Sequence, residues 1–195
     1  MNLLEDYREP YDRAELAAGL AQYAGADRRG AEALLIRLAC DADALVRTEA
    51  YDSLAAFPTQ STEHFLKQAI PREADELARA YAIMSWTDVV ETRCDDAAMA
   101  FADKQLAAEA SDCCQVCLWR AKYLFGDRNA EKKLISFLQH DDYHIRCFVV
   151  DFLREVLDAD NKNQITSAVS QLLAGEPAVC VCERAEALLR EAEEL

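Results

Sequence analysis

A small side chain followed four residues later by a large one recurs along this chain, and this pattern constrains the fold more than any other feature. Five such pairs occur, at intervals of 32, 39, 28 and 36 residues. Each pair lies in an amphipathic segment that follows a shorter amphipathic segment, which predicts a repeating unit of two helices joined by a short turn. One such hairpin cannot bury its apolar face alone, whereas stacked hairpins can. The pairs are Ala50 and Leu54, Ala82 and Trp86, Ala121 and Phe125, Val149 and Leu153, and Ala185 and Leu189.

The composition also favours helices over sheets. The chain has only 5 glycines and 4 prolines in 195 residues, fewer than a sandwich or barrel with many tight turns needs. No segment alternates between apolar and polar residues for long enough to predict a strand. Helices are expected at about residues 11–24, 28–40, 43–57, 61–70, 73–90, 94–109, 112–125, 130–139, 142–158, 162–174 and 177–193.

The turn before the first pair carries a more specific pattern. An acidic turn precedes Val46 and Arg47, then Ala50 and Leu54, and the fourth unit repeats this with Asp141, Asp142, Ile145 and Arg146. The second unit has Arg79 at the position of Arg47, while the third and fifth units are assigned Leu118 and Cys182 at that position. This pattern resembles the HEAT repeat, particularly its short bacterial form. Armadillo-like and other helix-pair repeats stay open as alternatives.

The resemblance implies an all-α fold, a right-handed α-solenoid of about five antiparallel helix hairpins, forming one domain over residues 1–195. Residues 1–27 are expected to cap it, with repeats at about 28–58, 61–91, 94–126, 130–158 and 162–193. It implies binding of macromolecules along the concave side and no chemistry of its own. Arg47, Arg79 and Arg146 are expected to form a structural ladder with the acidic turns, because partly buried charges are usually paired.

The net charge of −15 is spread along the whole chain. Residues 1–60 carry −5, residues 61–126 carry −4 and residues 127–195 carry −6. Such a field repels nucleic acid and anionic membranes, so the expected partner is a protein with a basic contact surface. No apolar run has the length of a membrane span, and the first ten residues do not form a signal peptide. A cytoplasmic monomer is expected.

Few residues suggest chemistry. There is no phosphate-binding loop, nucleophile elbow or metalloprotease motif, and only three histidines are present. His140 and His144 lie four apart, but across a predicted turn, so solvated side chains are favoured over a metal site. Cys114 and Cys117 fall on the predicted core face, and all eight cysteines are expected to be reduced and free of metal. No catalytic residue, cofactor or metal is predicted.

The outer faces of the second helices provide the candidate binding site. Positions two before and two after each small anchor residue, such as Thr48 and Ala80, are expected to point outward on a wheel of 100° per residue. The predicted contact residues are Trp119 and Tyr123 as central aromatic anchors, Met84 beside them, and Asp52 and Asp151 at the rim. Exposed aromatic side chains at the centre of an array are typical of a binding hot spot.

These observations favour a non-enzymatic protein-binding module. One alternative is an acidic immunity or antitoxin-type protein that neutralises a basic toxin. A second alternative is an enzyme, because alkylpurine DNA glycosylases and phycobilin lyases resemble short HEAT-like arrays. Trp119 and Asp151 would then be the groove residues of a glycosylase, but such a groove also needs basic residues for the phosphates, and the outward positions carry more acid than base.

Overall fold

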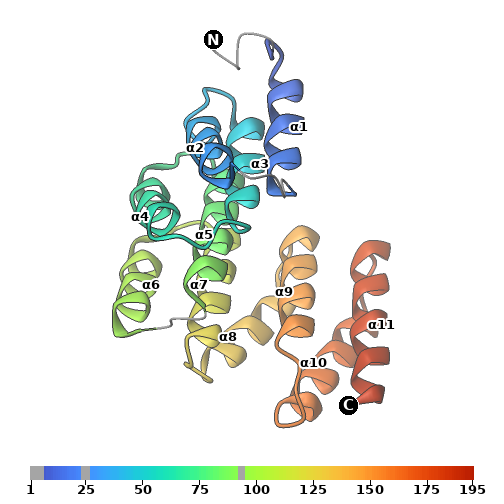
Figure 1. Cartoon of the computed structure of the whole chain (residues 1–195). Helices are drawn as coiled ribbons and strands as arrows, with labels where there is room; N and C mark the ends of the chain where they lie inside the picture. Colours follow the sequence, from blue (N-terminus) through green and yellow to red (C-terminus); the bar gives the residue numbers. More distant parts are fainter. Residues whose placement is uncertain (1–6, 23–26, 92–94) are drawn as a thin grey trace. The chain divides into compact units, whose positions relative to one another are not determined.

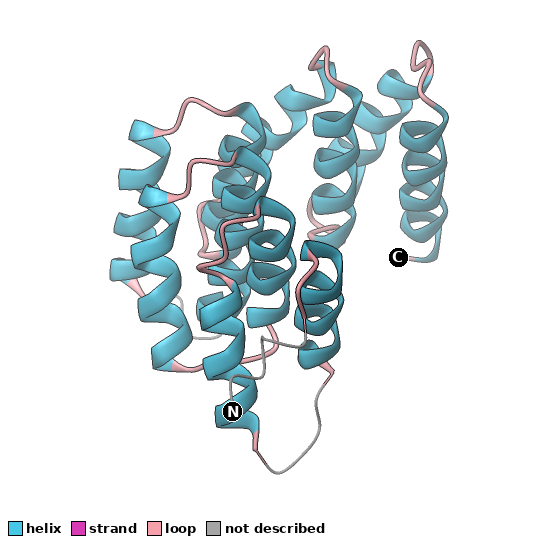
Figure 2. Cartoon of the chain, turned by 90° about the horizontal axis from the view of Figure 1, so that it is seen from above, coloured by secondary structure: helices cyan, strands magenta, loops and turns pink. Residues whose placement is uncertain are grey.

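The computed structural model describes residues 7–22, 27–91 and 95–195, and helices dominate throughout these ranges (Figure 1). Figure 2 shows the helices joined by loops, without a strand in the described part of the chain. The predicted all-α fold is therefore confirmed, with helices that pack in sequence order as in an α-solenoid. The helices are α1 (Pro10–Ala21), α2 (Arg28–Leu38), α3 (Ala44–Leu54), α4 (Gln60–Ala69), α5 (Glu76–Val90), α6 (Asp96–Ala108), α7 (Asp112–Leu124), α8 (Ala130–Ser136), α9 (Tyr143–Glu155), α10 (Lys162–Leu173) and α11 (Val179–Glu194).

The chain divides into two compact units, residues 1–117 and residues 118–195, and the division falls within α7. In the first unit α3 packs between α1 and α5, while α2 and α4 cover α3 and α5 from the side. In the second unit α9 packs against α8 and α11, and α10 packs against α11. We call α3, α5, α7, α9 and α11 the B helices. The small anchors Ala50, Ala82, Ala121, Val149 and Ala185 are all fully buried.

An acidic residue organises the turn before most B helices. Glu73 lies two residues before Asp75, and its carboxylate accepts the backbone N–H of Asp75 at 3.0 Å. The Asp75 side chain in turn accepts the N–H of Ala78, which caps α5. The same contact to the backbone N–H two residues later is made by Asp41, Glu109 and Glu176. In the fourth repeat His140 replaces the acid, and its Nδ1 accepts the N–H of Asp142.

Arginines join these turns into a ladder within each unit. Arg47 donates from Nε and Nη2 to the carboxylate of Glu73 in the next turn, both at 2.7 Å. Its Nη1 donates to the carbonyl oxygens of its own turn, at Asp41 and Ala42. Arg79 with Glu109 and Arg146 with Glu176 repeat this arrangement, so the predicted ladder is present. Arg13 of α1 makes the same bidentate pair with Asp41, which the sequence pattern did not predict.

The ladder also corrects the alignment of the third repeat. In α3, α5 and α9 the arginine of the ladder lies four residues after the residue that precedes the helix. In α7 the residue at this position is Gln115. Its Nε2 donates to the Glu109 carbonyl oxygen, as Arg79 does to that of Glu73. Leu118, and not Ala121, therefore occupies the place of Ala50. The prediction was wrong here because Leu118 is large, so the small-large pattern selected Ala121, three residues further along.

Candidate protein-binding face

One stripe of α1, α3 and α5 stays at the surface. It comprises the residues two, six, nine and thirteen positions after the residue that precedes the helix, a spacing that lies on one helical face. We call these positions the outer stripe. In these three helices of the first unit all of them are exposed or half-buried. They are Tyr11, Glu15, Ala18 and Gln22 in α1, Leu45, Glu49, Asp52 and Ala56 in α3, and Leu77, Tyr81, Met84 and Asp88 in α5.

The outer stripe of the first unit carries a concentrated negative charge. Its twelve positions hold four acidic residues and no basic one. Desolvation, with the negative charge of Asp88, raises the pKa of Asp52. Desolvation and the charge of Asp52 likewise raise the pKa of Glu49. No ion pair to a basic residue is found for Glu49 or Asp52 among the described residues, so these two residues offer negative charge that the fold itself does not neutralise.

The predicted contact residues of the first unit lie on this stripe. Asp52 is exposed and Met84 is half-buried, on the neighbouring helices α3 and α5. The positions two before each anchor were predicted to point outward as well, but Thr48 and Ala80 are buried. The wheel placed the outward direction too far round α3, because α1 and α5 pack against α3 on either side.

Trp119 is the predicted contact residue that lies on α7 in the second unit. It is half-buried, and two lysine ammonium groups lie near its indole ring, Lys122 Nζ at 5.1 Å and Lys133 Nζ at 6.0 Å from the ring centroid. In α3 and α9 the equivalent residues, Tyr51 and Val150, are buried. Cation–π contacts of this kind contribute about 0.5–1 kcal/mol at exposed sites. Trp119 is thus a partly open aromatic side chain in basic surroundings.

The prediction that Tyr123 faces outward is wrong, since only 5% of the residue is exposed. Its hydroxyl accepts a hydrogen bond from Asn161 Nδ2 at 3.0 Å, and Asn161 also donates to the Val156 carbonyl oxygen. Arg128 donates to the same hydroxyl and its guanidinium lies over the ring. Residues that follow α7 and α9 therefore bury Tyr123, and a single-helix wheel cannot detect contacts made so far along the chain.

Asp151 is half-buried on α9, and Arg184 of α11 forms an ion pair with it. Its charge is therefore balanced within the second unit, unlike those of Glu49 and Asp52. The residues that the sequence analysis missed are Glu49, Tyr81 and Asp88, together with Leu45 and Leu77 on the same stripe. The two alignments agree for α3 and α5, so these residues were missed because the outward direction assumed on the wheel was wrong, not because of the register.

The cysteines and histidines form no metal site in the described ranges. Cys114 and Cys117 are fully buried, as predicted, and burial raises the pKa of Cys114 to about 12. Cys147 and Cys180 lie with their sulfur atoms 3.6 Å apart, and desolvation is the main cause that raises the pKa of Cys147 to about 11. Cys94 lies outside the described residues. His140 precedes α9 and His144 lies within it, so the turn separates them as predicted.

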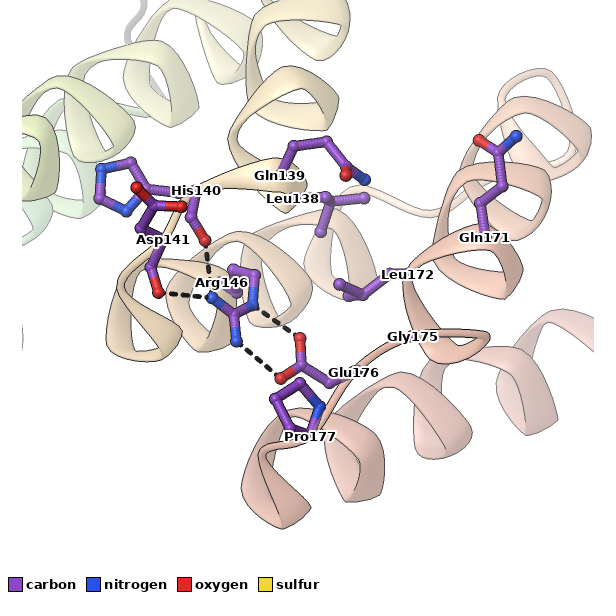
Figure 3. A pocket seen from close by; sticks show the side chains of 10 residues that line it. All are labelled: Leu138, Gln139, His140, Asp141, Arg146, Gln171, Leu172, Gly175, Glu176 and Pro177. Carbon is purple, nitrogen blue, oxygen red and sulfur yellow. Dashed lines mark hydrogen bonds and ion pairs between the residues drawn. The ribbon is translucent and has the colours of Figure 1, made fainter.

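An open depression of about 360 Å³ lies in the second unit beside the turn between α10 and α11 (Figure 3). Arg146 and Glu176 meet at its wall, where the guanidinium donates to both carboxylate oxygens at 2.6 Å. The guanidinium also donates to the carbonyl oxygens of His140 and Asp141. Arg146 and Glu176 are both used by the ladder, so this wall of the depression is part of a structural turn.

Comparison with protein families supports the repeat interpretation. The family model that matches is described as HEAT repeats, and it covers residues 1–86. Residues 1–86 therefore match HEAT repeats. Comparisons with curated proteins and with solved structures give no match. HEAT repeats generally mediate protein–protein interactions, and no helix in the described ranges has the length and apolar character to cross a membrane.

Proposed function

We propose that this helical-repeat protein is a non-enzymatic binding module, which recognises a protein partner with a basic contact surface through the outer stripe of its first unit. The observation that carries the proposal is the pair of acidic side chains on α3, Glu49 and Asp52, which the fold leaves without basic partners among the described residues. A carboxylate held near other carboxylates is destabilising for the protein alone, and a cationic partner relieves that repulsion.

Asp52 and Met84 are the proposed contact residues of the first unit, and Trp119 is the proposed aromatic contact of the second. Lys122 and Lys133 surround Trp119 with positive charge, so Trp119 suits an apolar or acidic contact, and Asp52 suits a basic one. Tyr123 is excluded because it is buried. Asp151 is weaker as a contact because Arg184 already neutralises it.

Affinity capture with charge variants tests this proposal. The full chain is immobilised, and proteins of the host cell that bind are quantified by mass spectrometry for the wild type and for Glu49→Gln/Asp52→Asn. The control is Asp96→Asn/Glu193→Gln, which removes the same charge from exposed positions on α6 and α11, away from the outer stripe. A basic protein retained by the wild type and the control but lost with the stripe variant supports the proposal. Partners that the stripe variant retains in full contradict it.

A further inference from the structure

Three large apolar side chains stand exposed at the same position of α1, α3 and α5 in the first unit. Tyr11, Leu45 and Leu77 each lie two residues after the residue that precedes α1, α3 and α5, and their exposed fractions are 64%, 48% and 48%. The ion pair of Arg13 with Asp41 joins the start of α1 to that of α3, and the pair of Arg47 with Glu73 joins the start of α3 to that of α5. The three side chains therefore form one row, which we call the apolar row.

The acidic side chains lie directly along the helices from this row. Glu15 and Glu49 follow Tyr11 and Leu45 by four residues, and Asp52 follows Leu45 by seven, so each lies on the same helical face as the apolar residue before it. α3 and α5 pack directly against each other, so their faces adjoin. The surface thus has an apolar edge at the starts of α1, α3 and α5, with a carboxylate one turn further on in α1 and carboxylates one and two turns further on in α3.

The spacing of the row selects the conformation of its partner. Packed helices lie about 8–10 Å apart, so neighbouring side chains of the row are separated by about one such distance. Seven residues of an α-helix rise about 10.5 Å, so apolar residues at every seventh position of a helix match the row. An extended strand repeats its facing side chains at about 6.6 or 13 Å, which does not match.

We propose that the apolar row and the carboxylates beside it bind a basic amphipathic helix of a partner protein. Apolar residues at seven-residue intervals of that helix contact Tyr11, Leu45 and Leu77, and lysines or arginines along its flank face Glu49 and Asp52. A second copy of this chain is disfavoured as the occupant because it would bring the same carboxylates against each other. This inference rests on the proposed function and narrows it to one kind of partner segment.

A pair of synthetic peptides tests the spacing. The first is a 21-residue peptide with leucine at every seventh position, lysines on the adjoining flank and alanine elsewhere. The second has the same composition, with the leucines moved to every fifth position so that they no longer share one face. Binding of the labelled peptides to the full chain is followed by fluorescence anisotropy. We expect the first peptide to bind at least 10-fold more tightly, and equal affinities would overturn the inference.

Variants of the surface locate the site. Leu45→Ala/Leu77→Ala should weaken binding of the first peptide at least 10-fold without lowering the melting temperature, because both side chains are exposed. Val179→Ala is the matched control, since Val179 is 70% exposed in the first turn of α11 in the other unit. It should leave binding unchanged. An equal loss with Val179→Ala, or no loss with the leucine variant, would count against the apolar row.

Two further outcomes separate this inference from the proposed function. If Glu49→Gln/Asp52→Asn weakens both peptides equally while Leu45→Ala/Leu77→Ala weakens neither, the charged face binds basic partners and the helical inference alone fails. If sedimentation shows a dimer of the wild type that Leu45→Ala/Leu77→Ala dissociates, the row is covered by a second copy of the chain and the inference is overturned.

Discussion

Arg146 and Glu176 show what the ladder contributes at the scale of single residues. The Glu176 side chain is 1% exposed and that of Arg146 is 10% exposed. Removal of one partner from a buried pair leaves the other charge uncompensated, which costs about 3 kcal/mol or more. We therefore expect Glu176→Gln to lower the melting temperature of the second unit by more than about 10 °C.

The pair of Arg154 with Glu191 provides a control in the same unit. It has the same chemistry, but its side chains are 44% and 45% exposed. Exposed pairs are screened by water and salt, so Glu191→Gln should leave the transition unchanged. Thermal unfolding followed by circular dichroism measures both variants. Equal losses for Glu176→Gln and Glu191→Gln would show that burial does not decide the strength of these pairs.

The same pair predicts a pH dependence. Hydrogen bonds from Arg146 lower the pKa of Glu176 below its ordinary value of 4.5. A carboxyl group with a lowered pKa stabilises the folded state fully above the ordinary value, and this contribution is lost as the pH falls toward the folded-state pKa. The difference in unfolding free energy between the wild type and Glu176→Gln should therefore be largest near neutral pH and shrink below about pH 4.5. A constant difference from pH 7 to pH 3 would contradict this.

The contribution of Asp52 to stability should depend on pH in the opposite direction. Desolvation and the charge of Asp88 raise its pKa, so its ionised form is disfavoured in the folded state. At neutral pH this repulsion destabilises the fold, and the effect fades as the pH falls through the raised pKa. Asp52→Asn should therefore raise the melting temperature at pH 7 and bring no gain in acid, as measured by thermal unfolding at both pH values. A gain in stability with a loss of binding is the trade-off expected of a functional residue.

At the scale of helices, periodicity predicted the elements well and their outward faces poorly. The expected helix at about residues 61–70 corresponds to α4 at Gln60–Ala69, because one apolar stripe and two clear breakers determine such a segment. The register of α7 was wrong because Leu118 occupies a place that is small in the other repeats. The burial of Tyr123 depends on Asn161, 38 residues away, and a local pattern carries no information about that contact.

The two tryptophans test the assignment of these faces. Trp86 is fully buried in α5, where its ring meets that of Phe101 edge-on at 4.8 Å. Trp86→Ala should cost about 3–5 kcal/mol of stability because it leaves a large cavity. Trp119→Ala should cost about 1 kcal/mol or less, since it removes a half-buried ring and its lysine contacts. Denaturant unfolding of the two variants measures this, and a larger loss for Trp119→Ala would show that Trp119 is a core residue.

At the scale of the whole molecule, the positions of the charged pairs follow the division of the chain. Within the described residues, the ladder pairs of Arg13, Arg47 and Arg79 lie in the first unit, and the pair of Arg146 lies in the second. The third repeat has Gln115 at the arginine position, and the fourth turn has His140 at the acid position. An amide and an imidazole cannot form the bidentate pair of a guanidinium and a carboxylate, so this step of the ladder lacks the necessary residue types.

This distribution predicts that the two units lose structure independently, because the stability of repeat arrays is a sum of local terms and nearest-neighbour interfaces. Arg47→Ala should accelerate amide hydrogen exchange in α3 and α5 and leave α9 and α11 at the wild-type rate. Arg146→Ala should do the reverse. Peptide-resolved mass spectrometry of the full chain measures both variants under the same conditions. If Arg47→Ala accelerates exchange in α11 as much as in α3, the chain opens as one cooperative body. The missing ion pair between the positions of Gln115 and His140 would then not limit how far a local disturbance spreads.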